Sequence, residues 1–182
     1  MRFLGIDPAT KTGIVALDIE GNVILERELR GEGPKDPGGI SDQQLVDLEN
    51  QLFRLMLPGD QITLESPAPG TIKAISTGFI HGGIRTMIHR KGLRYDLVNP
   101  MWTKKYVDVK VKRGQTQKEK KEEMAAAALK YFGYSHKSDN VVDAYIIARI
   151  CLNIYLMRNH KPLLDNERIQ REVVQDIIEK TF

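Results

Sequence analysis

Short apolar segments separated by brief polar turns dominate the first third of the chain. Apolar runs at residues 2–6, 13–19 and 23–29 follow one another so closely that they predict three antiparallel strands joined by tight turns. A further apolar run at 61–65 is stopped by the Pro- and Gly-containing stretch at 66–70, which can continue neither a strand nor a helix. The pattern therefore predicts a three-stranded meander, a later fourth strand and a loop after it.

Apolar residues at helical spacing mark most of the remaining chain. Ser41 and Gln44 have the spacing of a helix capping box, and four consecutive Ala at 125–128 precede a helix stop at Gly133. The predicted helices lie between Ser41 and Pro58 and over about 75–90, 101–107, 118–132, 141–155 and 166–180, with a fifth strand at 94–98. Antiparallel strands followed by alternating strands and helices indicate an α/β fold, in which helices flank a central five-stranded mixed sheet.

The composition is that of a globular protein rather than a disordered or disulfide-stabilised chain. With 41% hydrophobic and 28% charged residues over 182 positions, the chain can bury a core of its own. The single Cys151 cannot form an intramolecular disulfide, and together with four His it cannot make the usual zinc site. No window approaches eighteen uncharged apolar residues, so we expect no membrane contact and a cytoplasmic location. We expect one domain over residues 1–158 and a C-terminal amphipathic helical extension over 159–182.

The small net charge of +3 hides an asymmetry along the chain. Residues 101–131 carry nine basic against four acidic residues, whereas residues 31–60 carry two basic against six acidic residues. A basic run of this kind is typical of a surface that binds a phosphate backbone. It is equally compatible with a solvated Lys/Glu helix face, so charge alone leaves the partner open.

Three acidic residues stand where folding alone does not favour them. Asp7 ends the first strand, Glu65 ends the fourth, and Asp143 interrupts the apolar face of a late helix. Buried carboxylates are costly unless they are paired or bind a cation, and no Lys or Arg lies near the first two in sequence. If the first and fourth strands are neighbours, Asp7 and Glu65 lie side by side and require a divalent ion.

Asp139 and Asn140 precede Asp143 by four and three residues, so either can share its helix face and complete an oxygen-rich site. Ligands that are all oxygen favour magnesium or manganese over zinc. Each acid alone has an ordinary structural explanation: Asp7 can start a turn with Pro8, and Asp139 can be a helix N-cap. Their conjunction is what indicates a metal site.

These residues carry a resemblance to the RuvC-type Holliday junction resolvases. Residues 3–13, with Gly-Ile-Asp-Pro between an apolar strand and a turn, resemble the first motif of that family. Leu64-Glu65 is similar to the second acidic motif, and Ser138–Ala144 is similar to the closing motif. The segment 98–105, followed by Gly114 and Lys118 before a helix, is similar to the one that the family uses for junction DNA. The matches occur in order over residues 1–155.

The resemblance implies an RNase H-like fold and a metal-dependent endonuclease that resolves four-way, and possibly other branched, DNA junctions by paired nicks. The expected products carry 5′-phosphate and 3′-hydroxyl ends. Asp7, Glu65 and Asp143 would hold two Mg²⁺ ions about 4 Å apart, for which Mn²⁺ substitutes. The family commonly has an acid where this chain has Asn140, so the fourth ligand is either Asp139 or Asn140.

The resemblance also implies which residues meet the DNA. Lys118 would approach the scissile phosphate, and Phe79, after the second acid, is a candidate wedge between base pairs. The further residues expected to bind DNA are Lys104, Lys105, Lys110, Lys112, Arg113 and Lys121. Two nicks on opposing strands need two sites, so a two-fold homodimer is expected.

Other classes of protein share a related core. The Gly-Ile-Asp-Pro motif also resembles the phosphate loop of the sugar kinase, Hsp70 and actin superfamily, but those proteins bind ATP between two such domains and this motif occurs once. We therefore expect no nucleotide cofactor. A nuclease for flaps or RNA–DNA hybrids remains open, as does a non-catalytic binding module, although retention of all three acids favours catalysis. Divergence from the cellular resolvase motifs suggests a phage origin, hence a bacterial or phage-infected cell.

Overall fold

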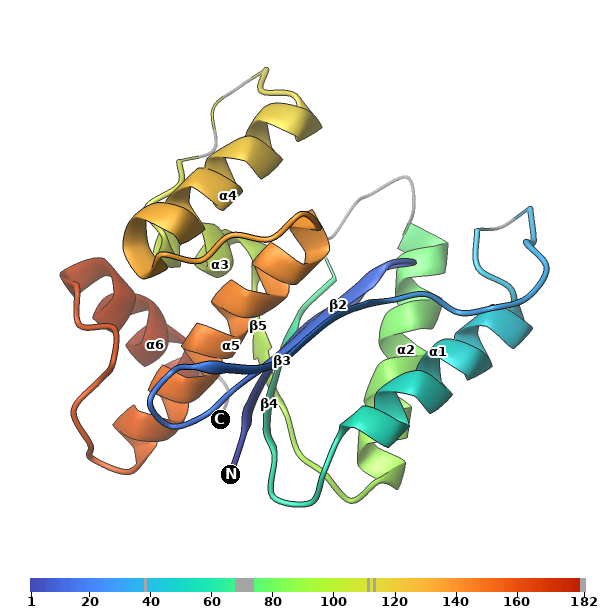
Figure 1. The fold of residues 1–182 in the computed structure, drawn as a ribbon, viewed down its shortest axis with the longest axis horizontal. Coiled ribbons are helices and arrows are strands. Elements are labelled where there is room, and N and C mark those ends of the chain that lie inside the picture. The colour runs from blue at the N-terminus through green and yellow to red at the C-terminus, as the bar shows by residue number, and fades with distance from the viewer. Residues whose placement is uncertain (38, 68–73, 111, 113, 181–182) are drawn as a thin grey trace.

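The computed structural model covers residues 1–182 and describes all of them except 38, 68–73, 111, 113 and 181–182. The described residues form one sheet with helices on both faces (Figure 1). The strands are β1 (Phe3–Asp7), β2 (Thr12–Leu17), β3 (Val23–Leu29), β4 (Gln61–Glu65) and β5 (Asp96–Val98). The helices are α1 (Asp42–Leu55), α2 (Ala74–Arg90), α3 (Pro100–Tyr106), α4 (Gln117–Phe132), α5 (Asp139–Arg158) and α6 (Arg168–Lys180).

The sheet has the strand order β3-β2-β1-β4-β5. The pairs β1–β2 and β2–β3 are antiparallel, whereas β1–β4 and β4–β5 are parallel. The predicted meander and the mixed five-stranded sheet are therefore confirmed. The central strand β1 joins the two halves of the sheet, so its last residue lies where antiparallel and parallel pairing meet.

Alternation along the strands sends apolar side chains to two separate cores. Leu4 and Ile6 of β1 pack with α1 and α2 on one face. Phe3 and Gly5 alternate with Leu4 and Ile6 and therefore lie on the opposite face, where Phe3 packs with α5. Helices α3, α4 and α6 complete that second core (Figure 1). Asp7 continues the alternation of Phe3 and Gly5, so it faces α5.

Helix α5 approaches the sheet closely because two glycines face it. A Cβ atom on Gly5 would lie 2.1 Å from the backbone oxygen of Ala144, and one on Gly13 would lie 1.9 Å from that of Asn140. Only backbone without a side chain fits at these two positions. The glycines of the first motif therefore set how near the N-terminal half of α5 lies to β1 and β2.

The predicted helix signals are confirmed, with one difference at α5. The capping box of Ser41 and Gln44 begins α1, and Gly133, with a φ of 67°, ends α4. Helix α5 starts at Asp139 after Ser138, whose side chain caps no backbone amide. Its hydroxyl donates instead to Glu28 of β3. Asp139 and Asn140 therefore belong to the first turn of α5 rather than forming its cap.

Helix α5 is long and apolar enough to cross a membrane by length and composition alone. In this fold, however, 72% of that apolar window is buried inside the chain, against the sheet and the surrounding helices. Burial of this extent identifies α5 as the central core helix of the domain.

The C-terminal segment packs onto the same core. Val173, Val174 and Ile177 of α6 are buried with α3 and α5. The connection before α6 is held by a buried polar network in which the hydroxyl of Tyr106 donates to Asp165 at 2.7 Å and Asn153 donates to Asp165 at 2.9 Å. The apolar stripe of α6 is thus covered within the chain.

Candidate active site

Asp7 and Glu65 end two parallel strands that are direct neighbours. Ile6 of β1 is paired with Leu64 of β4, so the next residue on each strand is one of the two acids. Asp143 lies on α5, which covers this part of the sheet. The three acids, more than 130 residues apart at the extremes, therefore meet at the carboxyl edge of β1 and β4, as the sequence pattern predicts.

The electrostatics of the acids show that they share one poorly solvated site. The pKa of Asp7 is raised well above its ordinary value by burial and then by the charges of Glu65 and Asp143. Burial followed by the charge of Asp143 raises the pKa of Glu65 to about 7. Burial followed by the charge of Asp139 raises the pKa of Asp143 to about 6. Glu65 and Asp143 therefore make ionisation of Asp7 harder, and Asp143 does the same for Glu65.

Two lysines that are distant in sequence partly offset this repulsion. The charge of Lys104 on α3 lowers the pKa values of Glu65 and Asp143, and the charge of Lys121 on α4 lowers those of Asp7 and Asp143. Neither lysine is close in sequence to Asp7 or Glu65, so neighbours along the chain do not reveal these cations. The packing of α3 and α4 beside the site supplies them.

A narrow cleft opens beside the acids. Thr103 of α3 donates a hydrogen bond of 3.1 Å to Glu65 Oε1, which holds that carboxylate against the wall of the cleft. The cavity measures about 140 Å³. Its walls are formed by Glu65, Pro100, Thr103, Lys104, Gln117, Lys120, Lys121, Met124 and Asp143.

The two candidates for a fourth ligand differ in their contacts. Asp139 is exposed and forms an ion pair with Lys121, with 2.9 Å between Oδ2 and Nζ. Asn140 is half-buried, and its Nδ2 lies 3.5 Å from Glu28 Oε2. The side chain of Asp139 is therefore directed to α4, while the side chain of Asn140 contacts the sheet at β3.

Glu28 of β3 is a residue near the site that sequence reasoning missed. Its carboxylate accepts the hydroxyl hydrogen of Ser138 and also pairs with Arg30, and these contacts lower its pKa. The signal that could have found it is the register of β2 and β3, which places Glu28 opposite Gly13. That register cannot be read from one strand alone.

The chemistry of these donors fits a hard divalent cation. Carboxylates from β1, β4 and α5 and an amide from α5 offer oxygen donors, and Lys104 and Lys121 offset only part of the increase in the pKa values of the carboxylates. Within the residues that the structure describes, no three His, Cys, Asp or Glu side chains stand close enough together to enclose an ion by themselves.

The predicted DNA-binding lysines fall into three environments. Lys104 and Lys121 line the cleft, whereas Lys105 turns to α6, 3.5 Å from Glu172 and 3.8 Å from Asp176. Lys118 is exposed and pairs with Glu122 at 3.7 Å. Lys118 is absent from the cleft walls among the described residues, and these walls instead include Lys121, three residues later on α4.

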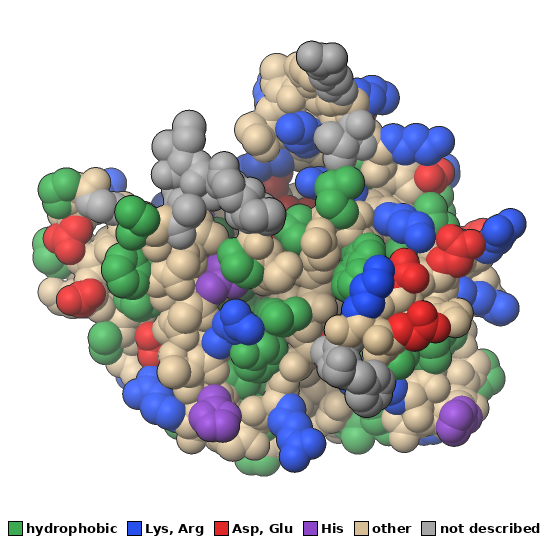
Figure 2. Space-filling model, turned by 180° about the vertical axis from the view of Figure 1, so that it is seen from behind, with side chains coloured by type: hydrophobic (Ala, Val, Ile, Leu, Met, Phe, Trp, Pro, Cys, Tyr) green, Lys and Arg blue, Asp and Glu red, His purple; other side chains and the backbone are tan. Residues whose placement is uncertain are grey.

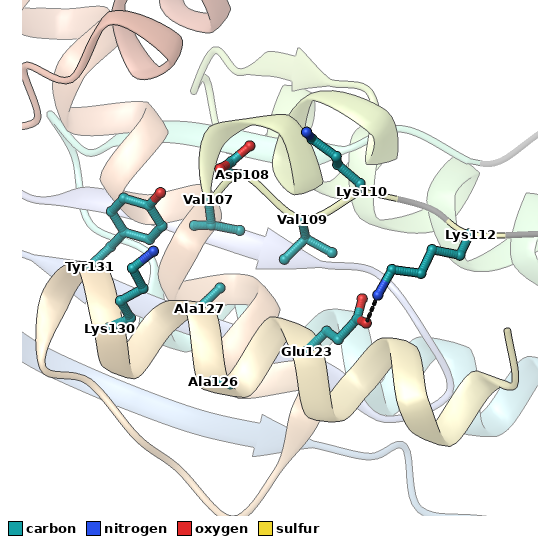
Figure 3. Close-up of a pocket in the computed structure, with 10 residues that line it drawn as sticks. All are labelled: Val107, Asp108, Val109, Lys110, Lys112, Glu123, Ala126, Ala127, Lys130 and Tyr131. Carbon is teal, nitrogen blue, oxygen red and sulfur yellow. Dashed lines mark hydrogen bonds and ion pairs between the residues drawn. The ribbon is translucent and has the colours of Figure 1, made fainter.

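Lys110 and Lys112 lie on a second groove, between α4 and the segment that follows α3 (Figure 3). Lys112 reaches across it to Glu123 of α4, with 3.1 Å between the charged atoms. The groove measures about 460 Å³, and its floor is apolar. None of the three clustered acids lines it. Arg113 lies outside the described residues.

Phe79 projects from α2 with 60% of its surface exposed, and Ile75 on the same helix is 75% exposed. Viewed from behind, Lys and Arg side chains gather over the end of the molecule that carries α3, α4 and α6 (Figure 2). An exposed apolar face and a basic face are therefore both present.

Two solved structures of RuvC from Thermus thermophilus have the same fold. One is RuvC in complex with a Holliday junction substrate, with a TM-score of 0.64, 16% sequence identity, and coverage of 87% of this chain and 96% of that chain. The other is a further RuvC structure, with a TM-score of 0.63, 16% identity, and coverage of 88% and 98%. The predicted RNase H-like fold is confirmed. No family model matches the sequence, and no curated protein matches it significantly.

Proposed function

We propose that this protein is a metal-dependent endonuclease that resolves four-way DNA junctions. The observation that carries the proposal is the meeting of Asp7, Glu65 and Asp143 beside a lysine-lined cleft, on the fold of a protein solved with a Holliday junction substrate. Carboxylates that raise one another's pKa values are costly to the fold and are typical of functional sites. The cytoplasm of a bacterial or phage-infected cell is the compartment that fits this role.

Asp7, Glu65, Asp143 and Asn140 would hold two Mg²⁺ ions, for which Mn²⁺ would substitute. Asp139 is the weaker candidate for the fourth ligand because its carboxylate is already paired with Lys121. When bound, such ions stabilise the charge on the attacking and leaving oxygens of a phosphodiester during in-line displacement. Thr103 would keep Glu65 oriented while the cleft changes charge.

The lysines would bind and orient the DNA. Lys104 and Lys121 line the cleft and would contact phosphates next to the cut. The proposed hydrolysis would leave 5′-phosphate and 3′-hydroxyl ends. Lys110 and Lys112 would hold the backbone farther along an arm, and Lys118 and Arg113 belong to the same basic stretch. These contacts recognise phosphate rather than sequence.

A homodimer would supply the two sites that a pair of nicks requires. With the stripe of α6 covered, the exposed Ile75 and Phe79 of α2 are an apolar surface that could serve self-association or contact with unpaired bases.

The experiment that tests the function is a cleavage assay that compares a four-way junction, a flap, a linear duplex and an RNA–DNA hybrid in Mg²⁺. We expect paired nicks in the junction and little cutting of the linear duplex, with no cutting when Mg²⁺ is chelated. Preferred cutting of the hybrid or the flap would assign the same site to another nuclease class. Binding without cutting of any substrate would indicate a non-catalytic module.

A further inference from the structure

Glu28 lies on the same face of the sheet as Asp7. Asp7 of β1 is opposite Gly13 of β2, and Gly13 is opposite Glu28 of β3. Residues that are directly paired across neighbouring strands point to the same face. Asp7 and Glu28 therefore flank Gly13 on the face that α5 covers.

Asn140 occupies the space over Gly13, between these two acids. A Cβ atom on Gly13 would lie 1.9 Å from the Asn140 backbone oxygen, so the first turn of α5 rests directly on this glycine. The backbone of Asn140 is thus placed between the strand positions of Asp7 and Glu28. Asp143, one turn later on α5, lies with the acid cluster.

The amide nitrogen of Asn140 faces Glu28. Its Nδ2 lies 3.5 Å from Glu28 Oε2, and the same oxygen accepts the hydroxyl hydrogen of Ser138 at 2.5 Å. The other carboxylate oxygen, Oε1, accepts a 2.9 Å hydrogen bond from Arg30. Glu28 is thus held from both sides, and no described residue donates to the amide oxygen of Asn140.

An amide differs from a carboxylate in having only one end that can bind a cation. Asn ligates through its oxygen, and its NH₂ group repels a metal ion, so the orientation of the amide decides whether the residue is a ligand at all. Residues behind a ligand that fix its orientation commonly change metal affinity by a factor of 10–100. A carboxylate at this position would need no such orientation.

We propose that Glu28 is a positioning residue that holds the amide nitrogen of Asn140 on the β3 side, so that the amide oxygen is the atom offered to a divalent cation. The inference rests on the proposed function, since it concerns the same metal site. Glu28 takes no part in the chemistry. It allows an amide to serve where the resembling family commonly has an acid.

The test measures Mn²⁺ binding to the DNA-free protein by electron paramagnetic resonance, in two backgrounds. With Asn140 present, Glu28→Ala should weaken Mn²⁺ binding by about 10-fold. With Asn140→Asp present, the same change should leave binding unchanged or strengthen it, because a carboxylate has no wrong end and loses a repelling neighbour. A dependence on the amide is an outcome that a purely structural role of Glu28 does not give.

Two controls accompany the comparison. Glu26→Ala removes an acid from the same face of β3, one that accepts a 2.7 Å hydrogen bond from Tyr134, and should leave Mn²⁺ affinity unchanged. Ser138→Ala removes the other donor to Glu28 Oε2 and should lower Mn²⁺ affinity less than Glu28→Ala does. Circular dichroism and thermal unfolding establish that each variant is folded.

Equal losses of Mn²⁺ affinity from Glu28→Ala in both backgrounds would overturn the inference. They would show that Glu28 acts only through its charge or through folding. Absence of loss from Glu28→Ala when Asn140 is present would overturn it as well. In both cases the proposed function survives if the wild type binds Mn²⁺ in a manner that Asp7→Asn abolishes and cuts junctions. If the wild type shows no such binding, the proposed function and the inference fail together.

Discussion

Asp7 is the residue on which the other groups of the acidic site converge. Burial and the charges of Glu65 and Asp143 raise its pKa, while Lys121 opposes them. Asp7→Asn should abolish cleavage, because it removes a negative ligand, while junction binding persists or tightens, because a charge that repels phosphate is lost. Cleavage and fluorescence anisotropy on the same four-way junction measure the two effects. Near-normal turnover would contradict the proposed metal site.

Glu65 makes a second prediction, about pH and stability without metal. Its pKa is raised from 4.5 to about 7 in the folded chain, so the folded state holds this proton over a range in which the unfolded chain has lost it. Its contribution to stability is therefore present below pH 4.5 and is lost as the pH rises through 7. Glu65→Gln removes the titration. Relative to the wild type, it should gain stability on going from pH 5 to pH 8.

Urea denaturation at the two pH values, in the presence of a chelator, measures this difference. The comparison with the variant is needed because other carboxylates, such as Asp18 and Glu28, have lowered pKa values and act in the opposite direction. A free-energy difference between variant and wild type that is equal at both pH values would contradict the assignment.

Among the elements, α3 is anchored from behind by the polar network around Asp165. The hydroxyl of Tyr106, the last residue of α3, donates to Asp165 and accepts from Asn153 of α5, and all three side chains are buried. Tyr106→Phe leaves these partners incompletely paired and should lower the free energy of unfolding by about 1–3 kcal/mol.

Urea denaturation with Tyr131→Phe as the matched control checks this value. The Tyr131 hydroxyl has no hydrogen-bond partner among the described residues, so its removal should change stability by less than about 0.5 kcal/mol. A similar small change for both variants would show that the network contributes little.

The elements themselves could be predicted largely from the sequence, because strand alternation, helical spacing and caps are local properties. The positions of Asp7 and Glu65 at the ends of apolar strands were also predictable, because a strand that ends in an acid is a local signal. That the two strands are neighbours is shown by the pairing of β1 with β4. The contacts of Lys121 with Asp139 and of Glu28 with Asn140 did not follow. They depend on how α4 lies against α5 and on strand register, which are set by packing between distant segments.

For the whole molecule, the position of the lysines leads to a prediction about salt. Junction affinity should fall steeply with salt, with a log–log slope of roughly −0.9 for each phosphate contact. Lys104→Ala should weaken binding and reduce the slope by about 1, because this residue lines the cleft. The neighbouring Lys105 pairs with two acids of α6, so Lys105→Ala is the matched control and should leave the slope unchanged.

Titrating fluorescently labelled junction at several salt concentrations, with metal chelated, gives these slopes. Equal changes for both lysines would place DNA across α6 as well. A binding constant that does not vary with salt would show that the basic surface does not contact the phosphate backbone.

The proposed dimer makes a prediction of its own. If each subunit cuts one strand, mixing wild-type and Asp7→Asn chains should yield heterodimers that nick a junction once without resolving it. A plasmid that carries an extruded four-way junction separates the outcomes, since one nick relaxes the circle and two make it linear. Sedimentation establishes the oligomeric state. A monomer, both alone and on DNA, would contradict this prediction.

The packing of α6 sets a practical limit on how far the chain can be trimmed. A chain truncated after residue 158 would follow the boundary predicted from the sequence. It would, however, lack Asp165 and the buried face of α6. Helix α3, which presents Thr103 and Lys104 to the cleft, would then have solvent behind it. An engineer who shortens this protein in that way would remove the packing that supports the candidate active site from behind.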